Sequence, residues 1–245
     1  MTVSGVPVLS VPRAAAEGIL RARLLKKDDR PTLIFTPNLE MLAAARRDPV
    51  RCARLRSAGL CLPDGVGTLL LSGGRIRERF PGIEAGEYLL SVAAEEDVGV
   101  YLLGGRPGVA EAAADRLRTR FPALRIVGTH HGYFAPESPD EARITEDLRR
   151  LSPGLLIVCT GFPRQEDYLV RVRSVLPGLR VGIALGGALD VWSGQLRRAP
   201  ELLRRCGLEW LWRVVREPKR LGRLGRAAFR ACLPQKKPES RGISP

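Results

Sequence analysis

Residues 98–111 of the chain read VGVYLLGGRPGVAE. The first six are apolar or glycine, a run long enough for a buried strand, and two glycines and a proline end it. From Val109 onward, apolar residues recur at helical spacing. A strand that passes through a glycine turn directly into a helix is the unit from which parallel α/β sheets are built. The stretch therefore predicts an α/β fold.

The same alternation of short apolar runs and amphipathic segments extends to both sides of this stretch. The expected strands cover residues 32–35, 59–62, 98–103, 125–128, 155–159 and 179–185. The expected helices cover residues 39–55, 84–96, 109–120, 140–151 and 165–175. Because the strands are almost uninterrupted apolar runs, we expect a mostly parallel, Rossmann-like sheet with helices on both faces.

The length of 245 residues suits one such domain with an appendage. We expect residues 1–195 to form the Rossmann-like domain, residues 196–233 a basic amphipathic helical appendage, and residues 234–245 a disordered tail. The net charge of +14 is uneven, because residues 196–245 hold 14 Lys and Arg against four Glu, and the first 195 residues carry only +4. This asymmetry predicts that the appendage meets a polyanion.

An anionic membrane surface fits the appendage better than nucleic acid does. Trp210 and Trp212 lie among apolar residues at helical spacing with arginines around them, which is typical of an interfacial helix. Aromatic residues, on which the bases of nucleic acids stack, make up only 5% of the chain. The sequence also leaves a homo-oligomer open, since the appendage can pack on its own body or on a neighbour's.

Composition argues against several other classes of protein. No apolar run reaches the roughly 18 residues of a spanning helix, and the first residues lack the pattern of a secretory signal. The five cysteines are scattered without a C-x-x-C pair, which is typical of reduced thiols in the cytoplasm. The two histidines, His130 and His131, are adjacent, so we expect no histidine metal site.

Polar and glycine residues follow each expected strand, at the edge where open parallel sheets bind ligands. The candidates at this edge are Thr36, Asn38, Asp64, Gly104, Gly105, Tyr133, Gln165, Glu166, Gly187 and Asp190. Asp64, between Pro63 and Gly65, can act as a general base or can cap the next helix.

The other candidates also have two interpretations. The turn at Gly104 and Gly105 can admit a phosphate or can be a structural tight turn. Gln165 can hydrogen-bond a base or sugar, and Glu166 can interact with the helix dipole, or both can be ordinary capping residues. Asp190 can hold a sugar hydroxyl or can order its own loop. These residues alone also leave open a nucleotide-binding oxidoreductase and a non-catalytic membrane-surface adaptor.

Taken together and in order, eight segments resemble the WecG/TagA/CpsF family of bacterial glycosyltransferases, glycosyltransferase family 26. The first seven are residues 36–38, 62–67, 79–84, 102–111, 128–134, 161–166 and 186–190, and the eighth consists of residues 198–200 followed by 207–211 and 217–220. The resemblance implies an inverting, metal-independent enzyme without a cofactor. Such an enzyme transfers an N-acetylmannosamine-type or related sugar from a UDP-sugar to a sugar on a polyprenyl-diphosphate carrier.

The resemblance also implies a place and roles. The enzyme would be cytoplasmic, attached peripherally to the inner face of the plasma membrane, and would serve the synthesis of teichoic acid or another cell-surface polysaccharide. Asp64 matches the catalytic base, and Thr36 and Asn38 match polar positions of the first loop. The cations expected to neutralise the diphosphate are Arg79, Arg216, Lys219, Arg220 and Arg223.

Overall fold

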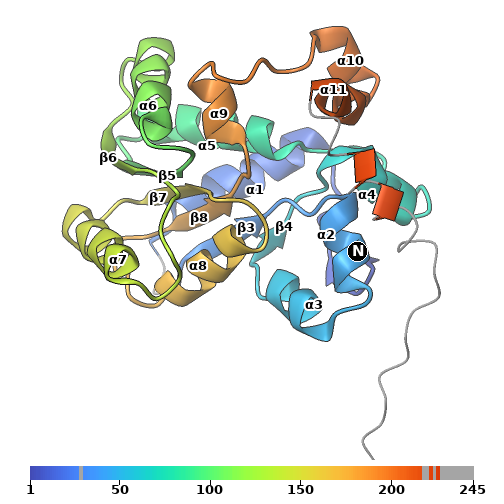
Figure 1. Cartoon of the computed structure of the whole chain (residues 1–245), viewed down its shortest axis with the longest axis horizontal. Coiled ribbons are helices and arrows are strands. Elements are labelled where there is room, and N and C mark those ends of the chain that lie inside the picture. The colour runs from blue at the N-terminus through green and yellow to red at the C-terminus, as the bar shows by residue number, and fades with distance from the viewer. Residues whose placement is uncertain (28–29, 217–220, 223–224, 227–245) are drawn as a thin grey trace, which may run out of the picture.

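A six-stranded sheet, in which every neighbouring pair of strands is parallel, forms the centre of the structure (Figure 1). The structure, a computed structural model, describes residues 1–27, 30–216, 221–222 and 225–226. In spatial order the strands are β4 (Leu60–Cys61), β3 (Thr32–Phe35), β8 (Val181–Ala184), β7 (Leu155–Cys159), β5 (Val100–Gly104) and β6 (Ile126–His130). The predicted α/β fold is confirmed, and the expected strands are present with ends displaced by at most two residues.

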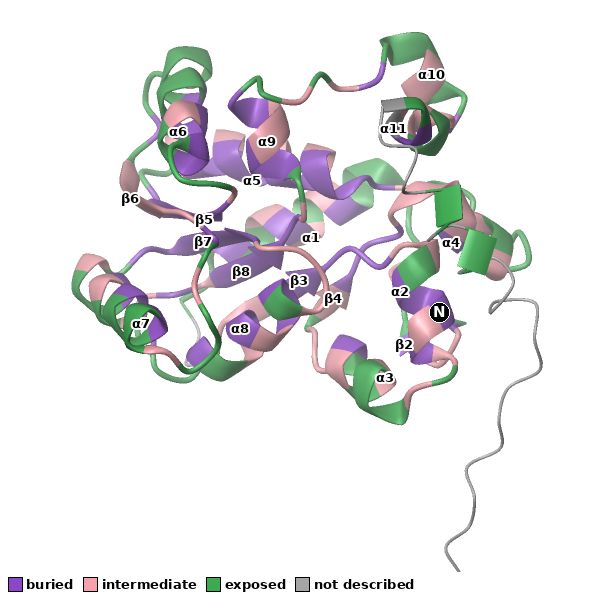
Figure 2. Ribbon diagram, in the orientation of Figure 1, coloured by how far each residue is buried: buried purple, intermediate pink, exposed green. Residues whose placement is uncertain are grey.

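Helices cover both faces of this sheet, as the sequence predicts (Figure 2). The helices on one face are α1 (Arg13–Leu25), α5 (Gly82–Glu95), α6 (Val109–Arg120) and α9 (Ala188–Trp192). Those on the other face are α2 (Leu39–Ala45), α3 (Pro49–Arg56), α7 (Pro139–Leu151) and α8 (Arg164–Val172). The molecule is therefore a three-layer sandwich with two apolar cores.

Strand β7 explains why the expected strands are continuous apolar runs. Leu155 and Ile157 belong to the core under α5 and α6, whereas Leu156 and Val158 belong to the core over α7 and α8. All four side chains are fully buried. Because successive side chains of a strand point to opposite faces, a strand covered on both sides needs an apolar residue at every position.

The single helix expected over residues 39–55 is wrong, because the structure has two helices there, α2 and α3. The first ends at Ala45, and Asp48 caps the start of the second, where its Oδ1 accepts hydrogen bonds from the backbone N–H groups of Val50 (2.9 Å) and Arg51 (3.2 Å). Pro49 occupies the first position of α3, where its missing N–H costs nothing. An Asp-Pro pair inside an amphipathic pattern is thus a new helix start rather than an interior position.

The first 25 residues form elements that the sequence did not predict. A short antiparallel hairpin joins β1 (Thr2–Val3) and β2 (Val6–Pro7) and buries Val3 and Val6 in the core over α2 and α3. Helix α1 then packs on α5, with Leu20 and Leu24 fully buried. The hairpin strands have two residues each and are too short to be recognised from periodicity, whereas α1 has 13 residues with a buried apolar face and was simply not predicted.

Three further helices of the described chain lie beyond the carboxyl ends of the strands. Helix α4 (Gly65–Leu71) follows β4, and the chain after α9 forms α10 (Glu201–Arg205) and α11 (Glu209–Arg216). A Cβ on Gly207 would lie 2.4 Å from Cγ2 of Val66, so the turn between α10 and α11 packs directly on α4. The boundary expected after residue 195 falls in the linker between α9 and α10, and the tail expected at 234–245 lies outside the described residues.

Candidate active site

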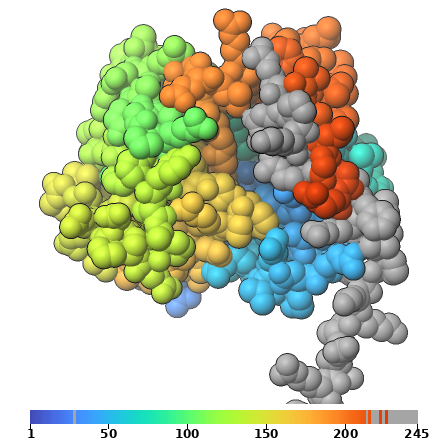
Figure 3. Space-filling view, viewed as in Figure 1, coloured from blue at the N-terminus to red at the C-terminus, as the bar shows by residue number. Residues whose placement is uncertain are grey.

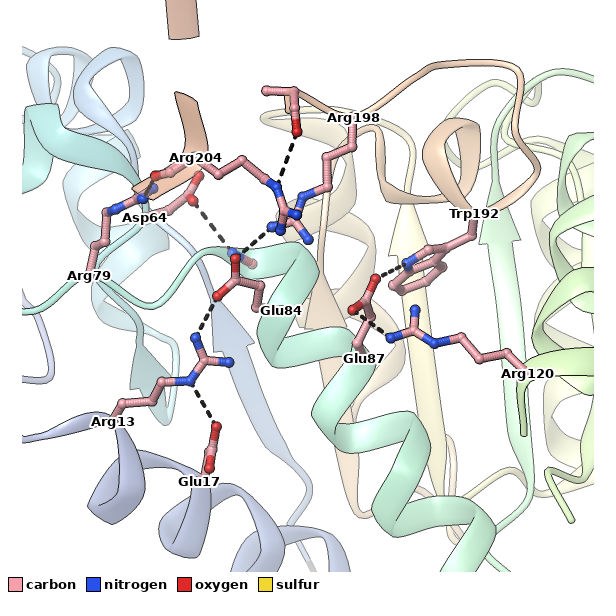
Figure 4. A network of polar contacts seen from close by, with 12 residues as sticks. Arg13, Glu17, Asp64, Arg79, Glu84, Glu87, Arg120, Trp192, Arg198 and Arg204 are labelled. Carbon is pink, nitrogen blue, oxygen red and sulfur yellow. Dashed lines mark hydrogen bonds and ion pairs between the residues drawn. The ribbon is translucent and has the colours of Figure 1, made fainter. Parts of the chain in front are cut away.

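Asp64 lies where α4 begins, but its carboxylate does not cap that helix. Its Oδ1 instead accepts a long hydrogen bond, 3.4 Å, from the backbone N–H of Gly82, the first residue of α5 (Figure 4). The N-terminal end of a helix stabilises negative charge, and α5 has no side-chain cap of its own. Asp64 is half-buried, so its carboxylate does not lie in the packed interior. It lies at the edge formed by the carboxyl ends of the strands and the loops that follow them, which we call the rim.

Thr36 lies beside this carboxylate, at the end of β3. Its hydroxyl donates to the carbonyl of Ala184 at 3.3 Å, which joins the ends of β3 and β8. A Cβ on Gly82 would lie 2.9 Å from Oγ1 of Thr36, so glycine is required for α5 to begin this close to the strand. The fold therefore gathers Thr36, Asp64 and the start of α5 at one point.

Asn38 has a structural task at the same rim. Its side-chain oxygen accepts a hydrogen bond from the backbone N–H of Met41 at 3.1 Å and caps α2. The cap uses the amide oxygen, so a ligand at this position would meet the NH2 group. Helix capping and ligand binding are thus compatible in Asn38.

Arg79 connects the loop before α5 to the appendage, here defined as residues 196–216 of the described chain. Its guanidinium donates to the backbone carbonyl of Arg204, the fourth residue of α10 (Figure 4). The next residue, Phe80, donates its backbone N–H to the carbonyl of Pro63 at 2.8 Å, which places Arg79 alongside Asp64. The appendage therefore borders the site, although Lys219, Arg220 and Arg223 and the side chain of Arg216 lie outside the described residues.

The turn at Gly104 and Gly105 is a point of close packing between chain segments. Gly104 has φ +143°, and a Cβ on it would lie 2.4 Å from the carbonyl oxygen of Cys159. The backbone N–H of Gly105 donates to the same carbonyl at 3.3 Å. The structural turn that the sequence left open is therefore present, and contact with a phosphate at this turn stays a prediction.

Gln165 ties together the loops that follow β7 and β8. Its Oε1 accepts backbone N–H groups from Gly161 (3.1 Å) and Gly186 (2.9 Å), and its Nε2 donates to Oε1 of Glu166 at 2.9 Å. The side chain is 4% exposed, and Glu166 is not exposed at all. Both residues thus lie under the loops at the middle of the rim and hold them in place. Because Oε1 of Gln165 already accepts two N–H groups, this side chain can contact a ligand only through its NH2 group.

Burial raises the pKa of Glu166 to about 7, and its Oε2 has no hydrogen-bond partner among the described residues. The folded protein then holds a proton that the unfolded chain releases at its ordinary, lower pKa. The free energy of unfolding should therefore fall by up to ~3 kcal/mol as the pH rises from about 4.5, the ordinary pKa, to about 7.

The variant Glu166→Gln, which is neutral at every pH, should abolish this dependence. Urea unfolding of both proteins between about pH 5 and 8 measures the effect. The variant Glu146→Gln, on the exposed side of α7, serves as the control and should keep the wild-type profile. Parallel profiles for Glu166→Gln and wild type would mean that Glu166 does not carry this proton.

The remaining predicted residues lie farther along the rim. Tyr133 follows β6 and is 64% exposed, Gly187 is exposed after β8, and Asp190 is half-buried in α9. Because β4 and β6 are the two edges of the sheet, Tyr133 and Asp64 follow strands that lie roughly 24 Å apart at ordinary strand spacing. The predicted residues therefore form an extended rim, with Asp64, Thr36, Asn38 and Arg79 at one end.

A charged network next to Asp64 was missed by the sequence analysis. Glu84, in the first turn of α5, pairs with Arg13 of α1 and with Arg198 of the linker before α10 (Figure 4). No spacing rule could have found it, because the partners are 71 and 114 residues away along the chain.

The described residues also bear on metal sites and on membrane-spanning helices. They hold no group of three or more His, Cys, Asp and Glu side chains arranged for a metal ion. Among the helices that the structure describes, none has the length and apolar character needed to cross a membrane.

Comparison with known proteins gives relatives over most of the chain. Three curated relatives are named N-acetylglucosaminyldiphosphoundecaprenol N-acetyl-beta-D-mannosaminyltransferase. Those of Bacillus subtilis (strain 168) and Staphylococcus aureus (strain MW2) are each 31% identical over 195 residues, 78% of this chain and 74% of the relative. That of Bacillus spizizenii is 30% identical over 199 residues, 80% of this chain and 76% of the relative.

A family model gives the same result for the chain as a whole. The model described as "Glycosyl transferase WecG/TagA/CpsF family" matches residues 1–234, which include the sheet, the rim and the appendage. Of the function classes that the alternation and the basic C-terminal part left open, this match selects the glycosyltransferase over the oxidoreductase and the adaptor. The chain accordingly belongs to the WecG/TagA/CpsF family of glycosyltransferases.

Proposed function

We propose that the protein transfers an N-acetylmannosamine-type sugar from a UDP-sugar to an N-acetylglucosamine on a polyprenyl diphosphate. The names of the three relatives support this acceptor and this sugar. The observation that carries the proposal is the placement of Asp64, which is held at the rim by the start of α5 and bordered by the appendage through Arg79. The product would serve a teichoic acid or another cell-surface polysaccharide.

In this mechanism Asp64 is the general base. It takes the proton of the acceptor hydroxyl while the hydroxyl oxygen bonds to the anomeric carbon and the bond to UDP breaks. UDP leaves with the electron pair of that bond, and attack from the opposite side inverts the anomeric centre. We assign Thr36 and the NH2 group of Asn38, which lie at the same end of the rim as the base, to orienting a sugar hydroxyl.

Positive charge must meet the leaving diphosphate. Arg79 supplies one guanidinium beside the base, and we assign the others to Arg216, Lys219, Arg220 and Arg223 of the C-terminal part. Preorganised cations stabilise a transition state whose charge is moving onto the leaving group. Farther along the rim, the turn at Gly104 and Gly105 together with Tyr133, Gln165, Gly187 and Asp190 would bind the donor, above the buried Glu166.

We place the enzyme at the inner face of the plasma membrane, where a lipid-linked acceptor is held. Large apolar side chains are exposed on the two helices of the appendage and on α4, against which the appendage packs, and this matches an interfacial surface. They are Leu70 of α4, Leu202 of α10, and Trp210, Leu211 and Val215 of α11. Burying them in a headgroup layer would bring Asp64 close to the acceptor's diphosphate.

An assay of UDP release tests the proposal. We expect release only when UDP-N-acetylmannosamine and a short-chain N-acetylglucosaminyl-diphosphoryl-polyprenol are both present, with a β-linked product by NMR. Parallel reactions with UDP-N-acetylglucosamine, UDP-N-acetylgalactosamine and UDP-glucose serve as donor controls. Release that does not depend on the acceptor, or transfer from another donor alone, would contradict the assignment.

The same assay tests how the leaving group is stabilised. The sequence contains no Asp-x-Asp pair, and in our mechanism cationic side chains carry the charge. Transfer should therefore continue in EDTA at close to its full rate. A strict requirement for added divalent ions would assign the charge stabilisation to a metal.

A further inference from the structure

Both oxygens of the Glu84 carboxylate are held by arginines from distant parts of the chain. Oε2 lies 2.5 Å from Nη1 of Arg13 in α1, and Oε1 lies 2.7 Å from Nη2 of Arg198 in the linker (Figure 4). Burial acts to raise the pKa of Glu84, but the two arginines together lower it below its ordinary value. Glu84 is thus a carboxylate that links the body of the protein to the linker.

The pair of Glu84 with Arg198 differs from the exposed ion pairs on the molecular surface. The two side chains are 19% and 16% exposed, whereas Arg13 is 46% exposed. The Nε of Arg198 is buried and has no hydrogen-bond partner in the described chain. The ion pair with Glu84 is therefore the main polar interaction of this guanidinium among the described residues. Partly buried pairs are screened less by salt than exposed ones, and the loss of one partner leaves the other charge poorly solvated.

From Arg198 a series of contacts leads back to Arg79, at the end of the rim that holds Asp64. The next residue, Ala199, is buried, and its carbonyl accepts a hydrogen bond from Nε of Arg204 at 3.1 Å. The carbonyl of Arg204 in turn accepts the guanidinium of Arg79. Because Glu84 lies two residues after Gly82, which binds Asp64, one helix end holds both the base and the start of this series.

We propose that Glu84 and Arg198 are positioning residues for sugar transfer, whose ion pair holds α10 and Arg79 over Asp64. The pair acts through the appendage and does not touch the reacting atoms. The proposal deepens the proposed function and rests on it, because α10 belongs to the surface assigned to the membrane of the lipid-linked acceptor and Arg79 is the cation assigned to the leaving diphosphate. Its consequence is that loss of the pair weakens binding of the lipid acceptor and slows the departure of UDP, whereas ground-state binding of the donor, farther along the rim, is independent of the pair.

Kinetics of four variants test this consequence. In Glu84→Gln and in Arg198→Gln the KM for the lipid acceptor should rise about tenfold, which corresponds to ~1.4 kcal/mol, with the KM for the donor unchanged. The double variant should be no worse than either single variant, since both remove the same interaction. Arg198→Lys keeps the charge and should recover most of the loss.

Arg13→Gln provides the matched control. It removes the other partner of the same carboxylate, on the side of α1, and leaves the pair with Arg198 in place. We expect its KM for the acceptor to stay at the wild-type value. Equal effects of Arg13→Gln and Arg198→Gln, or additive effects in the double variant, would overturn the proposal.

Amide hydrogen exchange gives a readout that needs no substrate. Exchange at residues 196–208 should speed up in Glu84→Gln and Arg198→Gln but not in Arg13→Gln, while exchange in β5 and β7 stays slow in all three. If the full-length protein transfers no sugar from any donor, the proposed function fails and the exchange result alone decides whether the pair positions the appendage. Unchanged exchange at these residues would overturn the positioning role even if transfer is observed.

Discussion

Replacing Asp64 with asparagine should lower kcat for sugar transfer by about 10² to 10⁴, the contribution typical of a positioned general base. An amide cannot accept the proton of the attacking hydroxyl, so the step that makes the acceptor nucleophilic is lost. The variant should nevertheless fold, because its amide oxygen can still accept the N–H of Gly82 and the wild-type side chain is only half-buried. Transfer kinetics together with the thermal unfolding midpoint measure both effects.

The variant Glu40→Gln is the matched control for Asp64→Asn. Glu40 is an exposed carboxylate in the first turn of α2, at the same rim but outside the group of Asp64, Thr36 and Arg79. Its neutralisation should leave kcat at the wild-type value. An Asp64→Asn protein that keeps full activity would remove Asp64 from the mechanism and direct attention to another proton acceptor.

Replacing Gly104 with alanine should destabilise the protein by about 3 kcal/mol or more, through backbone strain and overpacking together. At φ +143° a side chain is strongly disfavoured, and the new Cβ would lie 2.4 Å from the carbonyl oxygen of Cys159. That oxygen belongs to the backbone of β7, so it cannot move without disturbing the pairing of β5 with β7. Urea unfolding measures the loss.

Alanine substitutions at two neighbouring glycines provide the comparison for this result. Gly108→Ala should cost only ~1 kcal/mol, because Gly108 has φ +84° but open space around its Cβ position. Gly105→Ala should lie between the two, since its Cβ would meet the side chain of Val109, which can shift. If all three variants lost the same stability, left-handed backbone alone would explain these glycines, and the close approach to β7 would have no energetic weight.

The charge network around Glu84 shows why part of the site escaped sequence reasoning. Asp64 could be found because a strand end followed by Pro-Asp-Gly has a recognisable pattern, and its place at the sheet edge follows from the parallel topology. Glu84, Arg13 and Arg198 carry no such pattern, because each is one of many charged residues on a helix or a linker. Their partnership depends on how α1, α5 and the linker meet in space.

The two roles left open for Asp64 and for Glu166 illustrate a second limit. Both residues are polar, near a strand end and at a helix start, and so equally suited to capping or to ligand binding. The structure leaves the carboxylate of Asp64 half-buried against the N–H of Gly82 and buries Glu166 completely beneath Gln165. Burial is a property of the packed layers, so residue type and spacing could not distinguish the two cases.

Local chemistry was sufficient for the α/β class, the six strands, the glycine turns and the polar residues at the carboxyl edge. Each of these depends on the periodicity of apolar side chains or on the conformational freedom of a few residues, which neighbouring positions in the chain display directly. The strand order, the meeting of α5 with Asp64, the packing of the turn between α10 and α11 on α4, and the raised pKa of Glu166 required the folded chain. They arise from contacts and desolvation between segments tens to more than a hundred residues apart, and no local pattern specifies such contacts.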